Sequence, residues 1–389
     1  MEQLGRRKKI QFDFLLAAIV IALMIMGLLM LSNATGKPSI EFGSSWLDYI
    51  QAMNKYFFIR HLIWFGIGCV LAAGIMYVDY RAYGRYIGIA YIIVIALLVA
   101  VLVFGEDVMG QKRLSIGSGS SGIEVQPSEI AKLVLIIMMA KDLSNLEKGV
   151  TTVKQLFIIL LKAGIPLALM LQDIGTSVVY IFIVAVLLFV GGTKMWMLLT
   201  MLGAALASIV PIWQILGDVQ KLRILTFIDP TLDPTGTGYN VIHSKMAIGS
   251  GQMLGKGFFN PVAMSQLNYI PVQESDFIFA VTGETLGFWG TSFIVLLFAA
   301  LIFRMVYLAT KVEDKFGSLI IIGVAAMMFI HIFENVGMSI GIMPVTGIPL
   351  PFFSYGGSSM ITNMMGIGLV ECVWLRRKTA SKTNTFTLR

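Results

Sequence analysis

Charged residues are scarce in this sequence of 389 residues, at 13%. Soluble domains carry about 25% charged residues because their surfaces must meet water, so the composition excludes an ordinary soluble globular protein. Apolar residues make up 57% of the chain, and the mean hydropathy is +0.83. No stretch between the apolar runs is long enough for a separate soluble domain. We therefore expect residues 1–389 to form a single all-α polytopic transmembrane domain.

Cysteine is scarce as well. The chain has two, Cys69 and Cys372, and each lies inside an apolar run. This placement argues against a disulfide framework and favours two small apolar packing residues. The first apolar run follows basic residues at 6–9, as in a signal peptide, but it exceeds the about 7–15 apolar residues of such peptides. We expect it to remain as the first helix.

Long apolar runs are what the chain has in abundance. A helix needs about 20 apolar residues to cross the hydrocarbon layer of a bilayer. About ten transmembrane helices are predicted on this basis, beginning near Phe14, Phe57, Tyr83, Pro127, Gln155, Gly175, Met195, Asp276, Phe316 and Phe352.

The distribution of charge gives the expected orientation. With the amino terminus inside, about 18 Lys and Arg fall on cytoplasmic segments and about 8 on outer loops, as the positive-inside rule requires. Both termini are therefore predicted to be cytoplasmic, in a multi-pass protein of a plasma membrane. The net charge of +7 is assigned to the cytoplasmic face, where it would meet the anionic lipids of that leaflet. We therefore expect no nucleic-acid partner.

Two outer loops are long. Residues 105–126 contain a Gly/Ser run at 117–122 that we expect to be flexible. Residues 217–275, between the seventh and eighth helices, are rich in glycine and contain four prolines. Aromatic and aliphatic residues recur through this second loop, and a disordered segment would contain few of them. The large loop is therefore predicted to form a packed, partly helical extracytoplasmic lobe.

Ionisable groups at membrane depth are costly and usually face a partner or a cavity. Glu129 and Lys132 are three residues apart and follow Pro127, which suits the first position of a helix. Their side chains share one face and can pair. One interpretation is a structural ion pair that orients this helix. The other places the pair in the wall of a polar cavity, with Lys132 available to a phosphate.

Asp276 stands where the large loop meets the eighth helix. Aspartate is favoured as a helix N-cap, and capping is the simpler interpretation. Glu284 follows about two turns deeper on nearly the same face. Alternatively, a water-facing aspartate with a second acid beneath it can serve as a general base or a metal ligand.

Two further segments are candidates. Arg60 lies near the outer boundary of the second helix, where it either reaches toward the lipid headgroups or faces a cavity and binds an anion. Residues 344–359, P-V-T-G-I-P-L-P-F-F-S-Y-G-G-S-S, contain three prolines and cannot form a regular spanning helix. Irregular backbone at this depth must be covered by protein or water. We expect a re-entrant or cavity-lining segment that includes Ser358.

These segments together closely resemble the SEDS family (shape, elongation, division and sporulation) from about residue 13 to 377. The resemblance rests on Q-P-S-E-x-x-K at 126–132, Q-D-I-G-T at 172–176, R-I-L-T-F-I-D-P at 223–230, S-D-F-I-F-A-V at 275–281 and the 344–359 segment. G-K-G at 255–257 and P-V-T-G-I-P-L-P resemble the elongation branch. The chain departs from the family pattern at His243, Thr285 and residues 272–274.

The resemblance implies a peptidoglycan glycosyltransferase that polymerises lipid II, a disaccharide-pentapeptide on undecaprenyl pyrophosphate, into β-1,4 glycan strands. It implies that Asp276 is essential, as the base of one inverting displacement. Lys132, Arg60, Arg223 or a divalent cation (Mg²⁺ or Mn²⁺) would stabilise the leaving pyrophosphate. Further substrate contacts are expected at Glu129, Glu284 and Ser358.

The family also implies a class B penicillin-binding protein, a transpeptidase, as the partner, and a role in cell shape. No dedicated metal motif is visible in the sequence. A lipid II flippase and a non-catalytic cell-wall scaffold remain as alternatives, because the same cavity and cations would serve a transporter and an essential base is required only by an enzyme.

Overall fold

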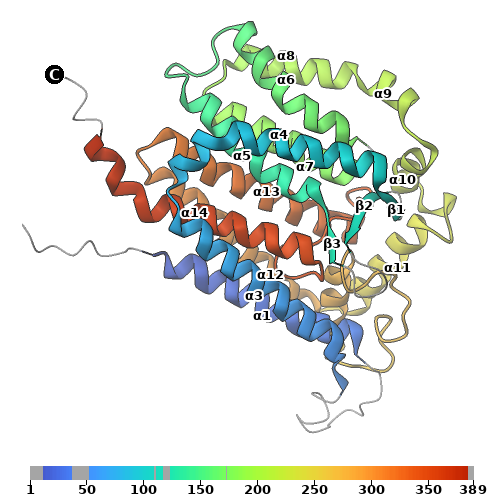
Figure 1. The fold of residues 1–389 in the computed structure, drawn as a ribbon. Helices are drawn as coiled ribbons and strands as arrows, with labels where there is room; N and C mark the ends of the chain where they lie inside the picture. Colours follow the sequence, from blue (N-terminus) through green and yellow to red (C-terminus); the bar gives the residue numbers. More distant parts are fainter. Residues whose placement is uncertain (1–11, 37–51, 109–110, 117–122, 172, 384–389) are drawn as a thin grey trace, which may run out of the picture.

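The structure, a computed structural model, describes residues 12–36, 52–108, 111–116, 123–171 and 173–383. Within these ranges the chain forms a bundle of long helices with one small sheet at one end (Figure 1). The long helices are α1 (Phe14–Thr35), α3 (Lys55–Tyr77), α4 (Tyr80–Phe104), α5 (Pro127–Ser144), α6 (Val153–Met170), α7 (Ile174–Val190), α8 (Met195–Ala207), α12 (Ile278–Thr310), α13 (Lys315–Ile340) and α14 (Gly357–Thr383).

Each of these helices begins within a few residues of a start expected from the sequence. Eight spans among the described residues are long and apolar enough to cross a membrane, one of them formed by α8 together with the short helix α9 (Ile209–Ile215). Helix α7 is apolar but has 17 residues, and α5 contains the charged pair Glu129 and Lys132. The predicted polytopic fold of long α-helices is confirmed, with one small sheet in addition. The number of membrane crossings and the orientation of the termini remain predictions. The basic residues at 6–9, on which the predicted orientation partly depends, lie outside the described residues.

Short polar side chains fix where several helices begin. The side chains of Asp13, Asn54, Asp79, Asp173 and Asp314 accept hydrogen bonds from backbone N–H groups in the first turns of α1, α3, α4, α7 and α13. These N–H groups have no partner within their own helix, and aspartate and asparagine satisfy them well. At α7, for example, the side chain of Asp173 accepts from the backbone N–H of Thr176.

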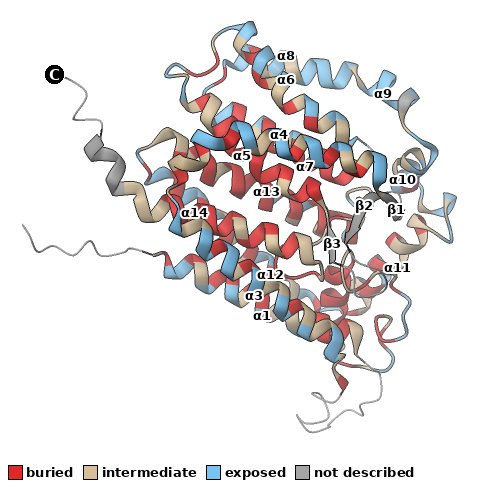
Figure 2. Ribbon diagram, in the orientation of Figure 1, coloured by how far each residue is buried: buried red, intermediate tan, exposed pale blue. Residues whose placement is uncertain are grey.

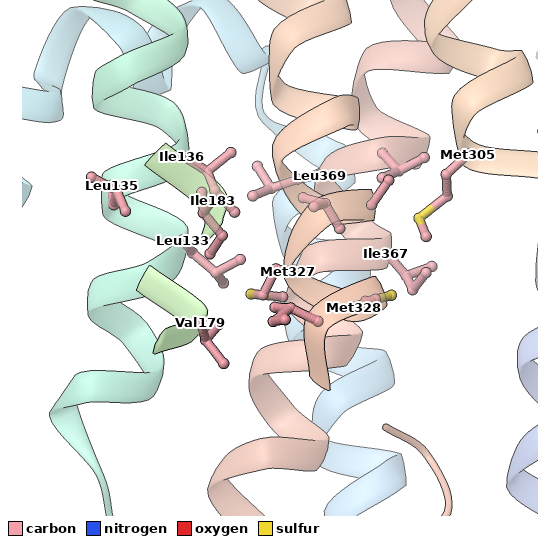
Figure 3. Close-up of a cluster of buried hydrophobic side chains, with 14 of the residues drawn as sticks. Leu133, Leu135, Ile136, Val179, Ile183, Met305, Met327, Met328, Ile367 and Leu369 are labelled. Carbon is pink, nitrogen blue, oxygen red and sulfur yellow. The ribbon is translucent and has the colours of Figure 1, made fainter. Parts of the chain in front are cut away.

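The core lies between α5, α7, α12, α13 and α14. Figure 3 shows side chains from these helices meeting in one cluster, including Leu133, Val179, Met305, Met327 and Ile367. Figure 2 shows α13 and α14 largely buried and α8 and α9 largely exposed. Exposed apolar side chains on the outer helices are expected in lipid, which solvates them as well as a protein core does.

A three-stranded antiparallel sheet, ordered β1 (Glu106–Val108), β2 (Gln111–Ile116) and β3 (Ile123–Val125), links α4 to α5. Glu106 pairs with Arg113, and Ile116 with Ile123. The sheet lies at the same end of the bundle as the start of α14 (Figure 1). From the sequence, residues 105–126 were expected to form a loop, so the sheet is an addition. The Gly/Ser run at 117–122 lies outside the described residues.

Residues 217–277 are partly helical, with α10 (Asp218–Ile228), a 3₁₀ turn η1 (Pro230–Leu232) and α11 (Thr237–Ser250), followed by turns. The turn at residues 251–257 packs directly on α12. Gly287 of α12 has a φ of 64°, a left-handed conformation that suits glycine, and a Cβ there would collide with the backbone of Gly255. The backbone N–H of Phe288 donates to the carbonyl of Gln252 at 2.8 Å. The helix is therefore kinked where the turn inserts.

Residues 342–356 connect α13 to α14 without helix, as the three prolines predicted. Helix α13 ends at Gly341 in the left-handed conformation, and α14 begins at Gly357, five residues after the expected start at Phe352. The side chains of Ile348, Leu350 and Phe353 in this segment are buried. The irregular backbone is thus covered by protein, as membrane depth requires.

Candidate active site

A cavity of about 400 Å³ lies at the end of the bundle that carries the sheet. Its wall is formed by the first half of α3, the starts of α5 and α14, one residue of α7, the segment preceding α12 and the irregular segment before α14. The lining residues are Tyr56, Phe57, Arg60, Trp64, Gln126, Glu129, Thr176, Glu274, Ser275, Asp276, Gly347, Ile348, Pro349, Tyr355, Gly356, Gly357, Ser358 and Ser359.

Asp276 lines this cavity, two residues before α12 begins. The N-cap position of α12 is occupied by Phe277, and no side chain caps the helix. Capping therefore does not account for the aspartate. Its Oδ1 accepts a hydrogen bond of 3.1 Å from the hydroxyl of Ser275. The residue is only partly buried and lines the cavity, so it can meet a ligand that enters.

The backbone around Asp276 is held by the irregular segment and by α13. The side-chain amide of Asn335 donates to the carbonyl of Asp276 at 2.9 Å and to that of Ile348 at 2.8 Å. The hydroxyl of Ser354 donates to the carbonyl of Ser275 at 2.6 Å. Asn335 is fully buried. Its role could not be predicted from the sequence, because an asparagine within an apolar helix does not reveal which distant backbone groups it will bond.

Glu129 also lines the cavity, and Lys132 lies behind it. The Lys132 ammonium is fully buried, 2.6 Å from Oε1 of Glu129 and 2.8 Å from Nε2 of His331 on α13. The ammonium has only hydrogens to offer, so Nε2 of His331 must accept, and the proton of a neutral ring is then on Nδ1. The structure has the ion pair of the first interpretation, inside the bundle. Glu129 lines the cavity, whereas Lys132 does not. His331 was not identified from the sequence.

Glu129→Ala is expected to lower the amount of folded protein as well as activity. The substitution removes the carboxylate that balances the charge of the buried Lys132 ammonium. Removing one partner of a buried ion pair costs about 3–5 kcal/mol. The measurement is the thermal unfolding midpoint of the purified protein and its yield from membranes.

The matched control is Glu147→Ala. Glu147 is an exposed acidic residue in the turn that follows α5, outside the helices. Surface substitutions of this kind usually change stability by no more than about 0.5 kcal/mol, so this variant should behave like the wild type. Equal unfolding midpoints for both variants and the wild type would show that the buried pair does not stabilise the fold.

Arg60 faces the cavity from the first half of α3. Its guanidinium lies 4.4 Å from the ring centre of Tyr56, close enough for a cation–π contact that orients it. Among the described residues that line the cavity, Arg60 is the only lysine or arginine. The structure therefore supports the cavity-facing interpretation of Arg60 over an interaction with lipid headgroups.

The cavity brings together four of the seven predicted site residues: Asp276, Glu129, Arg60 and Ser358. The hydroxyl of Ser358 accepts from the backbone N–H of Gln126 at 3.3 Å, so it fixes the start of α5 against α14. Lys132, Arg223 and Glu284 are not among the lining residues.

Glu284 has a different environment, deep in the contact between α12 and residues 250–265. It accepts hydrogen bonds from Lys256 (2.8 Å) and from the backbone N–H groups of Met264 (2.7 Å) and Ser265 (2.9 Å). The carboxylate is fully buried. This pattern of hydrogen bonds is typical of a structural residue that organises a loop. Arg223 lies elsewhere, on α10. Direct substrate contacts by Glu284 and Arg223 remain predictions.

A resident metal centre finds little support in the geometry. In the ranges that the structure describes, no group of three or more His, Cys, Asp or Glu side chains is arranged to hold an ion. The cavity offers separate carboxylates at Glu129, Glu274 and Asp276 instead. The described residues thus do not form a preformed all-protein cation site.

Comparisons with known proteins find relatives over nearly the whole chain. A family model described as "Cell cycle protein", for FtsW, RodA and SpoVE, matches residues 13–379. The peptidoglycan glycosyltransferase MrdB of Escherichia coli K12 is 33% identical over 380 residues, which cover 96% of each chain. The stage V sporulation protein E of Bacillus subtilis is 34% identical over 370 residues, 93% of this chain and 97% of the relative.

Solved structures are similar as well. A chain from a peptidoglycan synthase complex, described as coordinating polymerization and crosslinking, superposes with a TM-score of 0.75 at 29% identity, covering 94% of this chain and 98% of that one. The rod shape determining protein RodA of Thermus thermophilus superposes with a TM-score of 0.68 at 26% identity, covering 95% and 98%.

Proposed function

Because the chain belongs to the FtsW, RodA and SpoVE family of cell cycle proteins, we propose that the cavity around Asp276 is the site where it polymerises lipid II into glycan strands. The chain is a multi-pass membrane protein and a peptidoglycan glycosyltransferase. The observation that carries the assignment of the site is the carboxylate of Asp276 in a polar cavity at one end of an apolar bundle.

The position of this cavity suits a substrate with two unlike parts. A lipid-linked sugar keeps its chain in the bilayer and presents its headgroup at the interface. A cavity of about 400 Å³ falls in the range of about 300–1,000 Å³ that is typical of small-molecule sites. The aromatic side chains of Tyr56, Phe57, Trp64 and Tyr355 supply apolar surface, and carboxylates and hydroxyls supply hydrogen-bond acceptors.

The reaction converts an α-linked pyrophosphoryl sugar into a β-1,4 linkage, so a single displacement with inversion suffices. Asp276 takes the proton of the attacking 4-hydroxyl while the oxygen of that hydroxyl forms its bond to the anomeric carbon. The bond from that carbon to the pyrophosphate oxygen breaks, and the pyrophosphate leaves with the electron pair. One general base is required, and no covalent nucleophile takes part.

Charge develops on the leaving pyrophosphate, and a preorganised cation facing it lowers the barrier. The sequence left Lys132, Arg60 and Arg223 as candidates for this role. Lys132 is enclosed behind Glu129, and Arg223 lies on α10, outside the cavity wall. Arg60 is therefore assigned to the leaving group, and the planar guanidinium suits bidentate binding of phosphate oxygens.

A divalent cation, Mg²⁺ or Mn²⁺, remains part of the proposal from family resemblance. Mg²⁺ is commonly bound by one or two carboxylates together with substrate phosphates, so a cation would enter with the pyrophosphate. The described residues hold no preformed site for it, and no step of the reaction above is assigned to it.

A class B penicillin-binding protein is the proposed partner. One similar structure comes from a complex that joins polymerization to crosslinking, which supports a transpeptidase partner for this chain as well. The orientation with both termini in the cytoplasm belongs to the same proposal, since it puts the cavity, the sheet and residues 217–277 on the outer side. A role in cell elongation is proposed from the motifs shared with that branch.

The decisive measurement is polymerisation of lipid II by the purified protein, with and without a class B penicillin-binding protein. We expect glycan polymers from the wild type. Movement of lipid II across vesicle membranes without polymer would instead favour the flippase, and neither polymer nor transport would favour the scaffold.

A further inference from the structure

The outer end of α1 has carbonyl groups that its own helix cannot satisfy. The last four carbonyls of any α-helix lack an intrahelical partner. Two of those in α1 are bonded by side chains from far along the chain. Nε2 of Gln266 donates to the carbonyl of Asn33, and Nε2 of Gln273 donates to that of Ala34 at 2.8 Å.

The side chain of Asn33 itself forms two further hydrogen bonds, one to the irregular segment and one to α12. Its Oδ1 accepts from the backbone N–H of Phe259 at 2.6 Å, and its Nδ2 donates to the hydroxyl of Thr285 on α12 at 2.8 Å. Asn33, Gln266 and Gln273 are all buried, with 1%, 5% and 7% of their surface exposed. These hydrogen bonds are shielded from water, so breaking one leaves a buried polar group unsatisfied.

These contacts matter because residues 251–277 form no regular helix or strand. The position of such a segment is determined by the hydrogen bonds that its side chains and backbone form with neighbouring elements. Gln273 is three residues before Asp276. The residues from 274 onward are bonded on the other side by Asn335 and Ser354. The segment that carries the aspartate is thus held between the end of α1 and the wall formed by α13 and residues 342–356.

We propose that Asn33, Gln266 and Gln273 are positioning residues for glycosyl transfer, and that they fix the Asp276 carboxylate by binding its segment to the end of α1. None of the three lines the cavity, so they act through the segment and not on the substrate. The proposal rests on the function proposed above for Asp276. Precise placement matters because a displacement of about 1 Å can cost about 100-fold in rate.

The test uses Gln266→Glu and Gln273→Met in the full-length protein. In Gln266→Glu a carboxylate oxygen replaces the donor and faces the carbonyl of Asn33. Gln273→Met removes the hydrogen bond to the carbonyl of Ala34, and a longer one of 3.4 Å to Oδ1 of Asn268, without adding charge. We expect kcat for lipid II polymerisation to fall about tenfold or more in Gln266→Glu, and less in Gln273→Met, with KM within about twofold of the wild type.

A second readout separates positioning from general stability. Amide hydrogen exchange in residues 266–276 should become faster in both variants, while exchange in α13 stays unchanged, because only the local bonds are lost. If Gln266→Glu does not accumulate, the kcat and the hydrogen exchange of Gln273→Met alone test the positioning role. The matched control is Gln252→Glu, since Gln252 is an exposed glutamine of the same region, and it should keep the wild-type kcat.

The outcomes distinguish this proposal from the function on which it rests. An inactive wild type would overturn the proposed function. An active wild type together with variants of unchanged kcat and unchanged exchange would overturn the positioning role alone. A rise in KM at constant kcat would also overturn it, because that result indicates lost substrate binding and not a displaced base.

Discussion

Asp276→Asn is expected to lower kcat for lipid II polymerisation by about 10²–10⁴-fold, the usual contribution of a general base, with folded yield close to the wild type. The amide has the same shape and cannot take the proton of the attacking hydroxyl. Yield should hold because Asp276 does not cap α12, whose N-cap is Phe277. The measurement is polymer formation by purified variant and wild type at equal concentration.

The matched control is Asp218→Asn, which changes an exposed aspartate in the first turn of α10, outside the cavity. This variant should polymerise at the wild-type rate. An Asp276→Asn protein with wild-type activity would refute the role of the aspartate as the base. A variant that fails to fold would show that the carboxylate has a structural role.

Arg60→Ala is expected to lower kcat/KM by about 100-fold, since losing one preorganised group that stabilises developing charge costs about 10²–10³ in rate. No other lysine or arginine among the described residues lines the cavity, so no neighbouring cation compensates. Arg60→Lys should retain part of the activity, because an ammonium restores the charge without the bidentate geometry. Steady-state kinetics on lipid II provide the measurement.

Arg81→Ala serves as the matched control. Its guanidinium also lies over a tyrosine ring, that of Tyr80, at 5.4 Å, but Arg81 does not line the cavity. Loss of an arginine–tyrosine contact by itself should therefore leave kinetics unchanged. If Arg60→Ala and Arg81→Ala have equal, small effects, Arg60 does not bind the leaving group.

The helices could be predicted because composition and length determine them. An apolar run bounded by a capping residue, such as Asp173 before α7, defines both the helix and its start. Pro127 marked the beginning of α5 for the same local reason. The prolines of 344–359 excluded a helix there, and the chain is irregular through residue 356. Each of these features depends on neighbours in the sequence.

The partners in the site could not be predicted, since they depend on contacts between distant segments. His331 is 199 residues from Lys132, and Asn335 is 59 residues from Asp276. Helical spacing shows which residues share a face and not what that face meets. For that reason Glu284 was grouped with Asp276 from its position on α12, whereas the structure places it against the N–H groups of Met264 and Ser265.

The turn at residues 251–257 bonds to α12 on both sides of the kink at Gly287. The backbone N–H of Lys256 donates to the carbonyl of Glu284, and those of Phe288 and Trp289 donate to the carbonyls of Gln252 and Met253. Gly255 leaves no room for a side chain between the turn and the helix. The turn therefore joins the two pieces of α12 across the interruption, and the kink is a fixed bend that ties the start of α12 to the rest of the helix.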